Sequence, residues 1–128
     1  MAHLLDTSVA IAMRDADPAY RPRIERLGPD LAISVITRIE LEGGVYRDPT
    51  KAATRRARLD LVLSALSVLS FDDASADRYR HIVALRGFSR RKTLDRMIAA
   101  QALVHDLTLV TLNGADFADI PGLKVLAW

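Results

Sequence analysis

The longest patterned stretch of the chain runs from Thr93 to Phe117, and its hydrophobic spacing changes once along the way. Asp95 is followed at three, four and seven residues by apolar side chains, as on one face of a helix. These residues are Ile98, Ala99 and Ala102. Residues 107–112 are then almost uniformly apolar, as in a strand covered on both faces. The pattern predicts a helix with Thr93 as N-cap, a buried strand, and a turn at Asn113-Gly114.

Short apolar segments alternate with helical patterns along the rest of the chain. We predict strands at residues 3–6, 31–36, 68–71 and 123–126, and helices that begin near Ser8 and Thr37 and span about 18–27, 48–66 and 73–87. Gly43-Gly44 predicts either a break or a close helix contact. Strands that alternate with helices indicate a parallel sheet covered on both sides. We therefore predict an α/β fold with three α/β/α layers and a central, mainly parallel sheet, formed by one domain over residues 1–128.

Composition narrows the functional classes. Half of the 128 residues are hydrophobic, and no apolar run approaches the length of a membrane span, so we expect a cytoplasmic protein. The chain has no cysteine, which excludes disulfides, thiolate metal sites and cysteine nucleophiles. Its formal net charge of +2 does not by itself favour or exclude a nucleic-acid partner.

Four acids occupy comparable positions after the predicted strands. Asp6 follows the first strand, Glu40 lies one turn into the helix after the second, Asp95 opens the central helix, and Asp116 follows the strand after it. Right-handed connections bring such positions to one edge of a parallel sheet, where ligands of these folds bind. The four carboxylates are therefore expected to converge.

Each acid also has a purely structural alternative. Asp6 and Asp116 could cap the segments that follow them, and Thr37 with Glu40 fits a capping box. Asp95 in a first helical turn would be favoured by the helix dipole by about 0.3–1 kcal/mol. Four independent caps have no reason to fall at the same edge, and this coincidence favours a site.

The chemistry of such a cluster points to a divalent metal. Carboxylates held close together repel one another unless a cation lies between them. Oxygen ligands suit Mg²⁺ or Mn²⁺, and such an ion can activate water for hydrolysis of a phosphodiester. The three histidines are scattered, and the chain has no G-x-S-x-G motif and no phosphate-binding glycine loop.

Four segments together resemble the PIN-domain ribonucleases, and most of all the VapC-type toxins of bacterial toxin–antitoxin pairs. They are Leu4-Leu-Asp-Thr-Ser8, Ile33-Ser-Val-Ile-Thr-Arg-Ile-Glu-Leu41, Asp95-Arg-Met-Ile-Ala-Ala100 and Thr111-Leu-Asn-Gly-Ala-Asp-Phe117. The resemblance implies that Asp6, Glu40, Asp95 and Asp116 are catalytic metal ligands for Mg²⁺ or Mn²⁺. It also implies that Thr111 and Asn113 are polar supports, with Ser8 near the metal or phosphate. It further implies an RNA substrate, a cognate antitoxin protein and a homodimer.

Basic residues form two clusters. Arg86, Arg90, Arg91 and Lys92 precede Asp95, and we predict that they contact RNA phosphates. Arg55, Arg56 and Arg58 are instead expected to form solvated surface. The first hypothesis is a metal-dependent endoribonuclease toxin. The alternatives are a non-catalytic RNA-binding or regulatory module on the same fold, and a metal-dependent phosphatase of small molecules.

Overall fold

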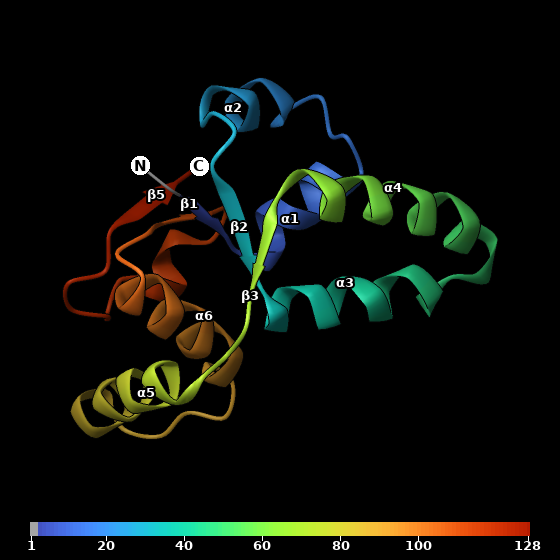
Figure 1. Ribbon diagram of the computed structural model, residues 1–128. Helices are drawn as coiled ribbons and strands as arrows, with labels where there is room; N and C mark the ends of the chain where they lie inside the picture. The colour runs from blue at the N-terminus through green and yellow to red at the C-terminus, as the bar shows by residue number, and fades with distance from the viewer. Residues whose placement is uncertain (1–2) are drawn as a thin grey trace.

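The computed structural model describes residues 3–128, and in this part of the chain five short strands form one parallel sheet (Figure 1). The strands are β1 (His3–Leu5), β2 (Leu31–Ser34), β3 (Ser67–Leu69), β4 (Thr108–Thr111) and β5 (Val125–Ala127). Their order is β3-β2-β1-β4-β5, and every neighbouring pair is parallel. The first strand of the chain thus occupies the centre of the sheet. The predicted parallel arrangement is confirmed.

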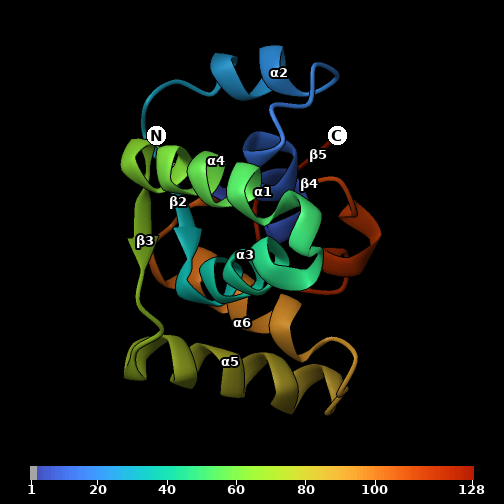
Figure 2. The same cartoon turned by 90° about the vertical axis from the view of Figure 1, so that its right-hand side faces the viewer.

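Helices cover both faces of this sheet (Figures 1 and 2). They are α1 (Thr7–Arg14), α2 (Arg21–Arg26), α3 (Val35–Arg47), α4 (Ala52–Ala65), α5 (Asp73–Arg86) and α6 (Thr93–Val104), with single turns η1 (Pro49–Lys51) and η2 (Gly114–Phe117). α6 lies on one face with α5 packed against it, whereas α1, α3 and α4 lie on the other. Among residues 3–128, no helix has the length and apolar character needed to span a bilayer.

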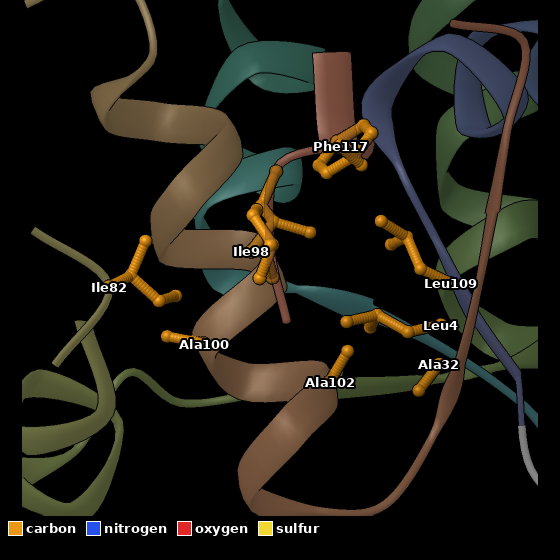
Figure 3. Packing of buried hydrophobic residues seen from close by; sticks show 10 residues of the cluster. Leu4, Ala32, Ile82, Ile98, Ala100, Ala102, Leu109 and Phe117 are labelled. Atoms are coloured by element: carbon orange, nitrogen blue, oxygen red, sulfur yellow. The ribbon is translucent and has the colours of Figure 1, made fainter. Parts of the chain in front are cut away.

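The hydrophobic core divides into two halves because strand side chains alternate between faces. Leu4, Ala32 and Leu109 are paired across β1, β2 and β4, and they pack towards α6 (Figure 3). Their neighbours Leu5, Ile33 and Val110 belong to the half covered by α1, α3 and α4. The three residues of the α6 stripe predicted from sequence, Ile98, Ala99 and Ala102, are at most 1% exposed. Two of them are alanines, which lets α6 lie close to the sheet.

Several predicted boundaries differ from those in the structure because short-range polar contacts decide where helices begin. The strand predicted at 31–36 ends at Ser34, whose hydroxyl accepts a hydrogen bond from the Ile36 N–H at 3.0 Å and caps α3. Asp72, rather than Asp73, caps α5. Thr93 is not the cap of α6: its hydroxyl donates to the Ser89 carbonyl at 2.9 Å, and Lys92 holds the cap position.

The double glycine of α3 marks a close contact and not a break. The helix runs through Gly43 and Gly44 without interruption. A Cβ atom on Gly44 would lie 3.1 Å from Nη1 of Arg14 on α1, which is tighter than ordinary van der Waals contact. Gly44 therefore lets the Arg14 side chain, only 5% exposed, lie directly against α3.

Candidate active site

Asp6 directly follows β1, the central strand of the sheet, and both of its carboxylate oxygens accept hydrogen bonds. It is 5% exposed, and Oδ1 accepts hydrogen bonds from the Val9 N–H at 3.1 Å and from the Ser8 hydroxyl. The hydroxyl of Thr111, at the end of β4, donates to Oδ2. Asp6 is therefore the N-cap of α1, as the structural alternative predicted. Because a cap needs only one of these oxygens, the bond from Thr111 shows a second role in joining two strand ends.

The polar residues around Asp6 connect the start of α1 to the end of β4. Ser8 Oγ accepts a hydrogen bond from the Leu112 N–H at 3.1 Å, so α1 is tied to the chain after β4. Thr111 Oγ1 accepts from the Asn113 N–H at 2.9 Å, and its own proton is thereby directed to Asp6. Ser8 and Thr111 thus both contact Asp6. Asn113 contributes through its backbone, while its side chain is exposed.

Glu40 is held from a neighbouring helix. Thr7 Oγ1 donates to Glu40 Oε1 at 2.8 Å, and the hydroxyls of Thr7 and the fully buried Thr37 lie 3.1 Å apart. The capping-box alternative is wrong, since Thr37 lies inside α3 and Ser34 is its cap. The carboxylate of Glu40 therefore leans towards α1 and the edge that carries Asp6.

The carboxyl group of Asp95 is influenced by the charges of the other three acids. Burial raises the pKa of the Asp95 carboxyl to about 6, with further upward contributions from the negative charges of Asp116, Asp6 and Glu40. Arg91 opposes these effects. A helix N-terminus alone would favour the charged form and lower this pKa. Asp95 does lie in the first turn of α6, as the helix-dipole alternative required, but burial and like charge raise its pKa.

The acids come from four separate segments of the fold. Asp6 follows β1, Glu40 lies on α3, Asp95 on the first turn of α6, and Asp116 in η2. All four lie beyond the carboxyl ends of parallel strands, where ligands of open α/β sheets bind. The convergence of the four carboxylates on one metal ion stays a prediction, and the negative charges of Asp116, Asp6 and Glu40 contribute to the raised pKa of Asp95.

The four candidate metal ligands have the right chemistry for a hard divalent cation, but they do not enclose one. All four candidate ligands are oxygens, as Mg²⁺ prefers. Within residues 3–128, no three acidic or histidine side chains form a ready-made cage for a metal ion. Mg²⁺ does not require one, because it commonly keeps several waters and takes only one or two carboxylates. The arrangement therefore fits a hydrated Mg²⁺ or Mn²⁺ and not a fully protein-enclosed ion.

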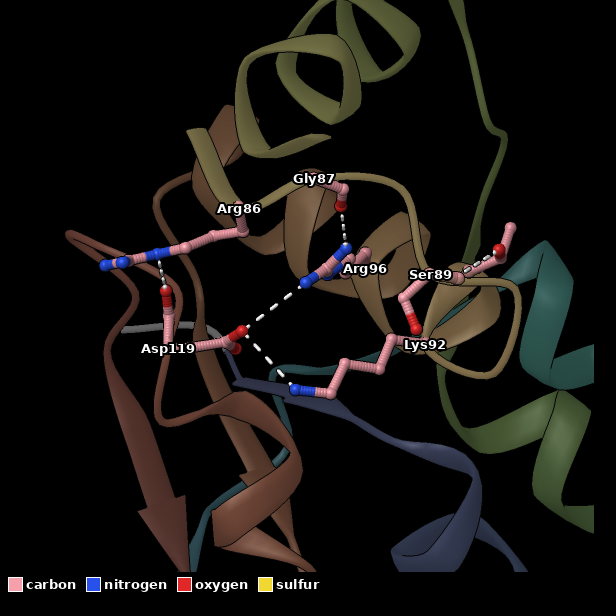
Figure 4. A network of polar contacts seen from close by, with 7 residues as sticks. Arg86, Gly87, Ser89, Lys92, Arg96 and Asp119 are labelled. Carbon is pink, nitrogen blue, oxygen red and sulfur yellow. Dashed lines mark hydrogen bonds and ion pairs between the residues drawn. The ribbon is translucent and has the colours of Figure 1, made fainter. Parts of the chain in front are cut away.

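The predicted basic loop is partly committed to internal contacts (Figure 4). Arg86 Nε donates to the Asp119 carbonyl at 2.7 Å, and Lys92 Nζ lies 3.4 Å from Asp119 Oδ2. The buried Arg96 reaches the same carboxylate at 3.4 Å and the Gly87 carbonyl at 2.7 Å. Of the four predicted phosphate contacts, Arg86, Arg90 and Arg91 are exposed and Lys92 is partly buried. Arg86 and Lys92 also help to fasten the α5–α6 loop to the segment after η2.

Sequence reasoning missed the residues that position the acids. Thr7 and Thr37 hold Glu40, while Arg96 and Asp119 connect the start of α6 to the chain beyond Asp116. One signal was present in the sequence: Arg96 interrupts an otherwise apolar face of the central helix. A buried arginine needs a partner, and none could be identified without the tertiary structure.

Comparisons with known proteins agree with this geometry. The family described as the PIN domain matches residues 3–123. Ribonuclease VapC2 of Rickettsia felis is 31% identical over 136 residues, which cover 100% of this chain and 98% of the relative.

Solved structures give the same result for the fold. The crystal structure of VapBC2 from Rickettsia felis bound to a DNA fragment from their promoter has a TM-score of 0.84 and 29% identity, with coverage of 100% of this chain and 99% of that one. The structure of DNA-bound VapBC from Salmonella typhimurium has a TM-score of 0.85 and 28% identity, with coverage of 100% and 98%. Similarity therefore extends over the whole length of the chain.

Proposed function

The chain belongs to the PIN-domain family, and from that premise we propose that it is a metal-dependent endoribonuclease acting as the toxin of a toxin–antitoxin pair. The proposal is supported by the positions of Asp6, Glu40, Asp95 and Asp116 beyond the carboxyl ends of the parallel strands, and by the raised pKa of Asp95, to which the other three acids contribute. The relative named as a ribonuclease supports the activity. The VapBC complexes support an antitoxin partner.

The residues of the site would act either as metal ligands or as groups that orient those ligands. A bound Mg²⁺ or Mn²⁺ would supply an activated water and neutralise charge on the RNA phosphate. Asp6 and Asp95 would hold it most directly, with Glu40 and Asp116 completing the negative site through the ion or its waters. Ser8 and Thr111 keep Asp6 in one orientation. Thr7 does the same for Glu40.

We further propose that the partners are single-stranded RNA as substrate, a cognate antitoxin as inhibitor and a second copy of the chain. An antitoxin that silences the site would present a cation to the four acids, since a guanidinium pairs well with carboxylates. Inhibition would then compete with Mn²⁺. Inhibition that leaves Mn²⁺ affinity untouched would place the antitoxin contact elsewhere.

The function is tested by incubating purified protein with cellular RNA and, separately, with a mononucleotide, each with Mn²⁺ or with EDTA. We expect RNA fragments with Mn²⁺, none with EDTA, and no phosphate released from the mononucleotide. Asp116→Asn should lose the activity. Asp106→Asn, which changes an exposed carboxylate paired with Lys124, is the matched control and should retain it.

The same experiment separates the alternatives. Undiminished cleavage in EDTA would remove the metal mechanism. Phosphate release from the mononucleotide without RNA cleavage would favour a phosphatase. RNA binding without cleavage under either condition would favour a non-catalytic module.

A further inference from the structure

A cleft lies beside Glu40. It has a volume of about 420 Å³ and lies between α1, α3 and the start of α4. Thr7 and Glu40 line it where it meets the candidate active site, and Arg14, Arg47 and Arg55 line it further along. A second hollow of about 250 Å³ shares Asp15 and Arg55 with it and adds Lys51 and Arg58. We call the two together the basic cleft.

Arg14 is paired with Asp15, whose carboxylate also lines both hollows, but three other arginines of the basic cleft form no ion pair with the described residues. Arg55 Nη1 donates to the Gly44 carbonyl at 2.9 Å, and Arg58 Nη1 donates to the Asp15 carbonyl at 2.9 Å. Across residues 3–128, no carboxylate lies within ion-pair distance of Arg47, Arg55 or Arg58. A guanidinium has five N–H donors, so one bond to a carbonyl orients the group and leaves most of its donors and its full charge available.

Arg56 shows the contrasting arrangement one residue along α4. Its guanidinium pairs with Glu42 at 2.7 Å and with Asp60 at 2.7 Å, and it does not line either hollow. The helix therefore separates a neutralised arginine from two arginines whose charge remains available. The solvated surface expected from the sequence is found for Arg58, which is exposed, whereas Arg55 and Arg56 are partly buried.

A ligand of the basic cleft should be polyanionic and polar. Ile11 is the single large apolar side chain among the residues that line the 420 Å³ hollow, so the cleft has no apolar floor for an amphipathic helix. Guanidinium groups suit phosphate oxygens, which they bind through paired N–H donors. The four acids repel an RNA strand, so cations beside them are needed to hold it. Lys92 is less suited to this role because its ammonium group lies 3.4 Å from the carboxylate of Asp119. Arg86 contacts only the Asp119 carbonyl and also keeps its charge, but it does not line the basic cleft.

We propose that the basic cleft binds backbone phosphates of single-stranded RNA beside the bond that is cut. This inference rests on the proposed ribonuclease function. Arg47 and Arg55 make the phosphate contacts nearest Glu40, and Lys51 and Arg58 extend them along α4. Nucleotides on one side of the cleaved bond would therefore be held by α3 and α4. The protein would then need an RNA substrate longer than the two nucleotides that flank this bond.

The test measures RNA binding in EDTA, so that cleavage does not interfere. The probe is a fluorescent oligouridylate of about 12 nucleotides, a length within the usual range for single-strand sites. Dissociation constants are measured between about 50 and 200 mM salt for wild type, Arg47→Gln, the double variant Arg47→Gln/Arg55→Gln, and the control Arg56→Gln. Arg47 is exposed, so its single substitution keeps the test valid if the double variant folds poorly.

We expect the magnitude of the salt slope to fall by about 0.7 for Arg47→Gln and about 1.4 for the double variant, because each phosphate contact to a single strand contributes about 0.7. Arg56→Gln should keep the wild-type slope. Binding of a uridine dinucleotide should not respond to any of these changes. An unchanged slope in both cleft variants overturns the inference.

Two further measurements distinguish the other outcomes. Wild-type cleavage of cellular RNA with Mn²⁺, combined with an unchanged slope, would remove the basic cleft and leave the proposed function intact. The expected slopes without any cleavage would remove the function and leave the RNA site. A glutamate peptide of about 12 residues whose binding depends on Arg47 and Arg55, while RNA binding does not, would assign the cleft to an acidic protein segment and overturn the inference.

Discussion

Asp6 and Asp95 are the same residue type in one site, yet their surroundings are opposite. Asp6 is almost fully buried and receives three hydrogen bonds, from Ser8, Val9 and Thr111. Asp95 is half-buried, and within residues 3–128 no hydrogen bond reaches its carboxylate, whose pKa is raised to about 6. Hydrogen bonds to an ionised carboxylate offset burial, whereas burial among like charges penalises ionisation. We call the surroundings of Asp6 the rigid side of the site, because hydrogen bonds hold its carboxylate, and those of Asp95 the strained side, because ionisation is disfavoured there.

Asp6→Asn should have the largest effect, because it disturbs the rigid side. Thr111 directs its proton towards Oδ2, and an amide nitrogen placed there cannot accept it. We expect the free energy of unfolding to fall by about 1–3 kcal/mol, the cost of a buried polar group left without its partner, and RNA cleavage to fall to background. Thermal melts in EDTA and an RNA cleavage assay measure both.

Thr111→Val removes the same donor from the other side and should reproduce the stability loss. Thr108→Val on the same strand is the control, since Thr108 lies at the far end of β4. A stable Asp6→Asn variant that still cuts RNA would show that the rigid side is no more than a helix cap.

Asp95→Asn should change stability in the opposite direction. A carboxyl whose pKa is raised in the folded state binds protons more tightly there than in the unfolded chain, so it lowers stability as the pH rises from about 4 to above 6. After allowance for solvent screening, the metal-free variant should be more stable than wild type by about 1 kcal/mol at pH 7.5. Melts in EDTA across this pH range measure the difference, which should vanish below about pH 4.

Metal should reverse that order. Wild type gains about 2.7 kcal/mol at a hundredfold excess of Mn²⁺ over its dissociation constant, and Asp95→Asn should gain much less. Equal pH profiles for the two proteins in EDTA would mean that Asp95 carries no electrostatic strain.

Asp119→Asn should have the smallest effect, because it loosens only the support of the strained side. Asp119 lies 3.4 Å from both Lys92 and Arg96, which flank the first turn of α6 (Figure 4). Partly exposed pairs at this distance contribute about 0.5–1 kcal/mol, and we expect a loss of that size in thermal melts. Asp106→Asn breaks the far more exposed pair with Lys124 and should melt like wild type. A similar loss in both variants would remove the special role of Asp119.

The elements of this fold could be predicted because they depend on local periodicity. The spacing of Ile98, Ala99 and Ala102 correctly predicts the buried face of α6 without tertiary information. The caps were less predictable. Asp72 and Asp73 are equally suitable caps for α5, whereas at α6 the better cap residue, Thr93, donates to the Ser89 carbonyl and Lys92 holds the cap position. A difference of one or two residues at a helix end changes few contacts, so sequence determines it weakly.

The acids of the candidate site could be predicted by position, but their supports could not. Thr7 and Glu40 are 33 residues apart, and Arg96 and Asp119 are 23 apart. Nothing in the local sequence links the members of either pair. The division between Arg55 and Arg56 is likewise set by which side of α4 faces Asp15 and Gly44.

The central position of β1 in the sheet affects when the protein can fold during its synthesis. The contact between Asp6 and Thr111 spans 105 residues. β1 pairs with β2 on one edge and with β4 on the other, so its second edge stays unpaired until β4 has been synthesised. At about 5–20 residues per second, a ribosome needs about 5–20 s to make the intervening chain. During that interval the nascent chain has a first acid but no finished site. The four candidate metal ligands can therefore come together only after Asp116 has been synthesised.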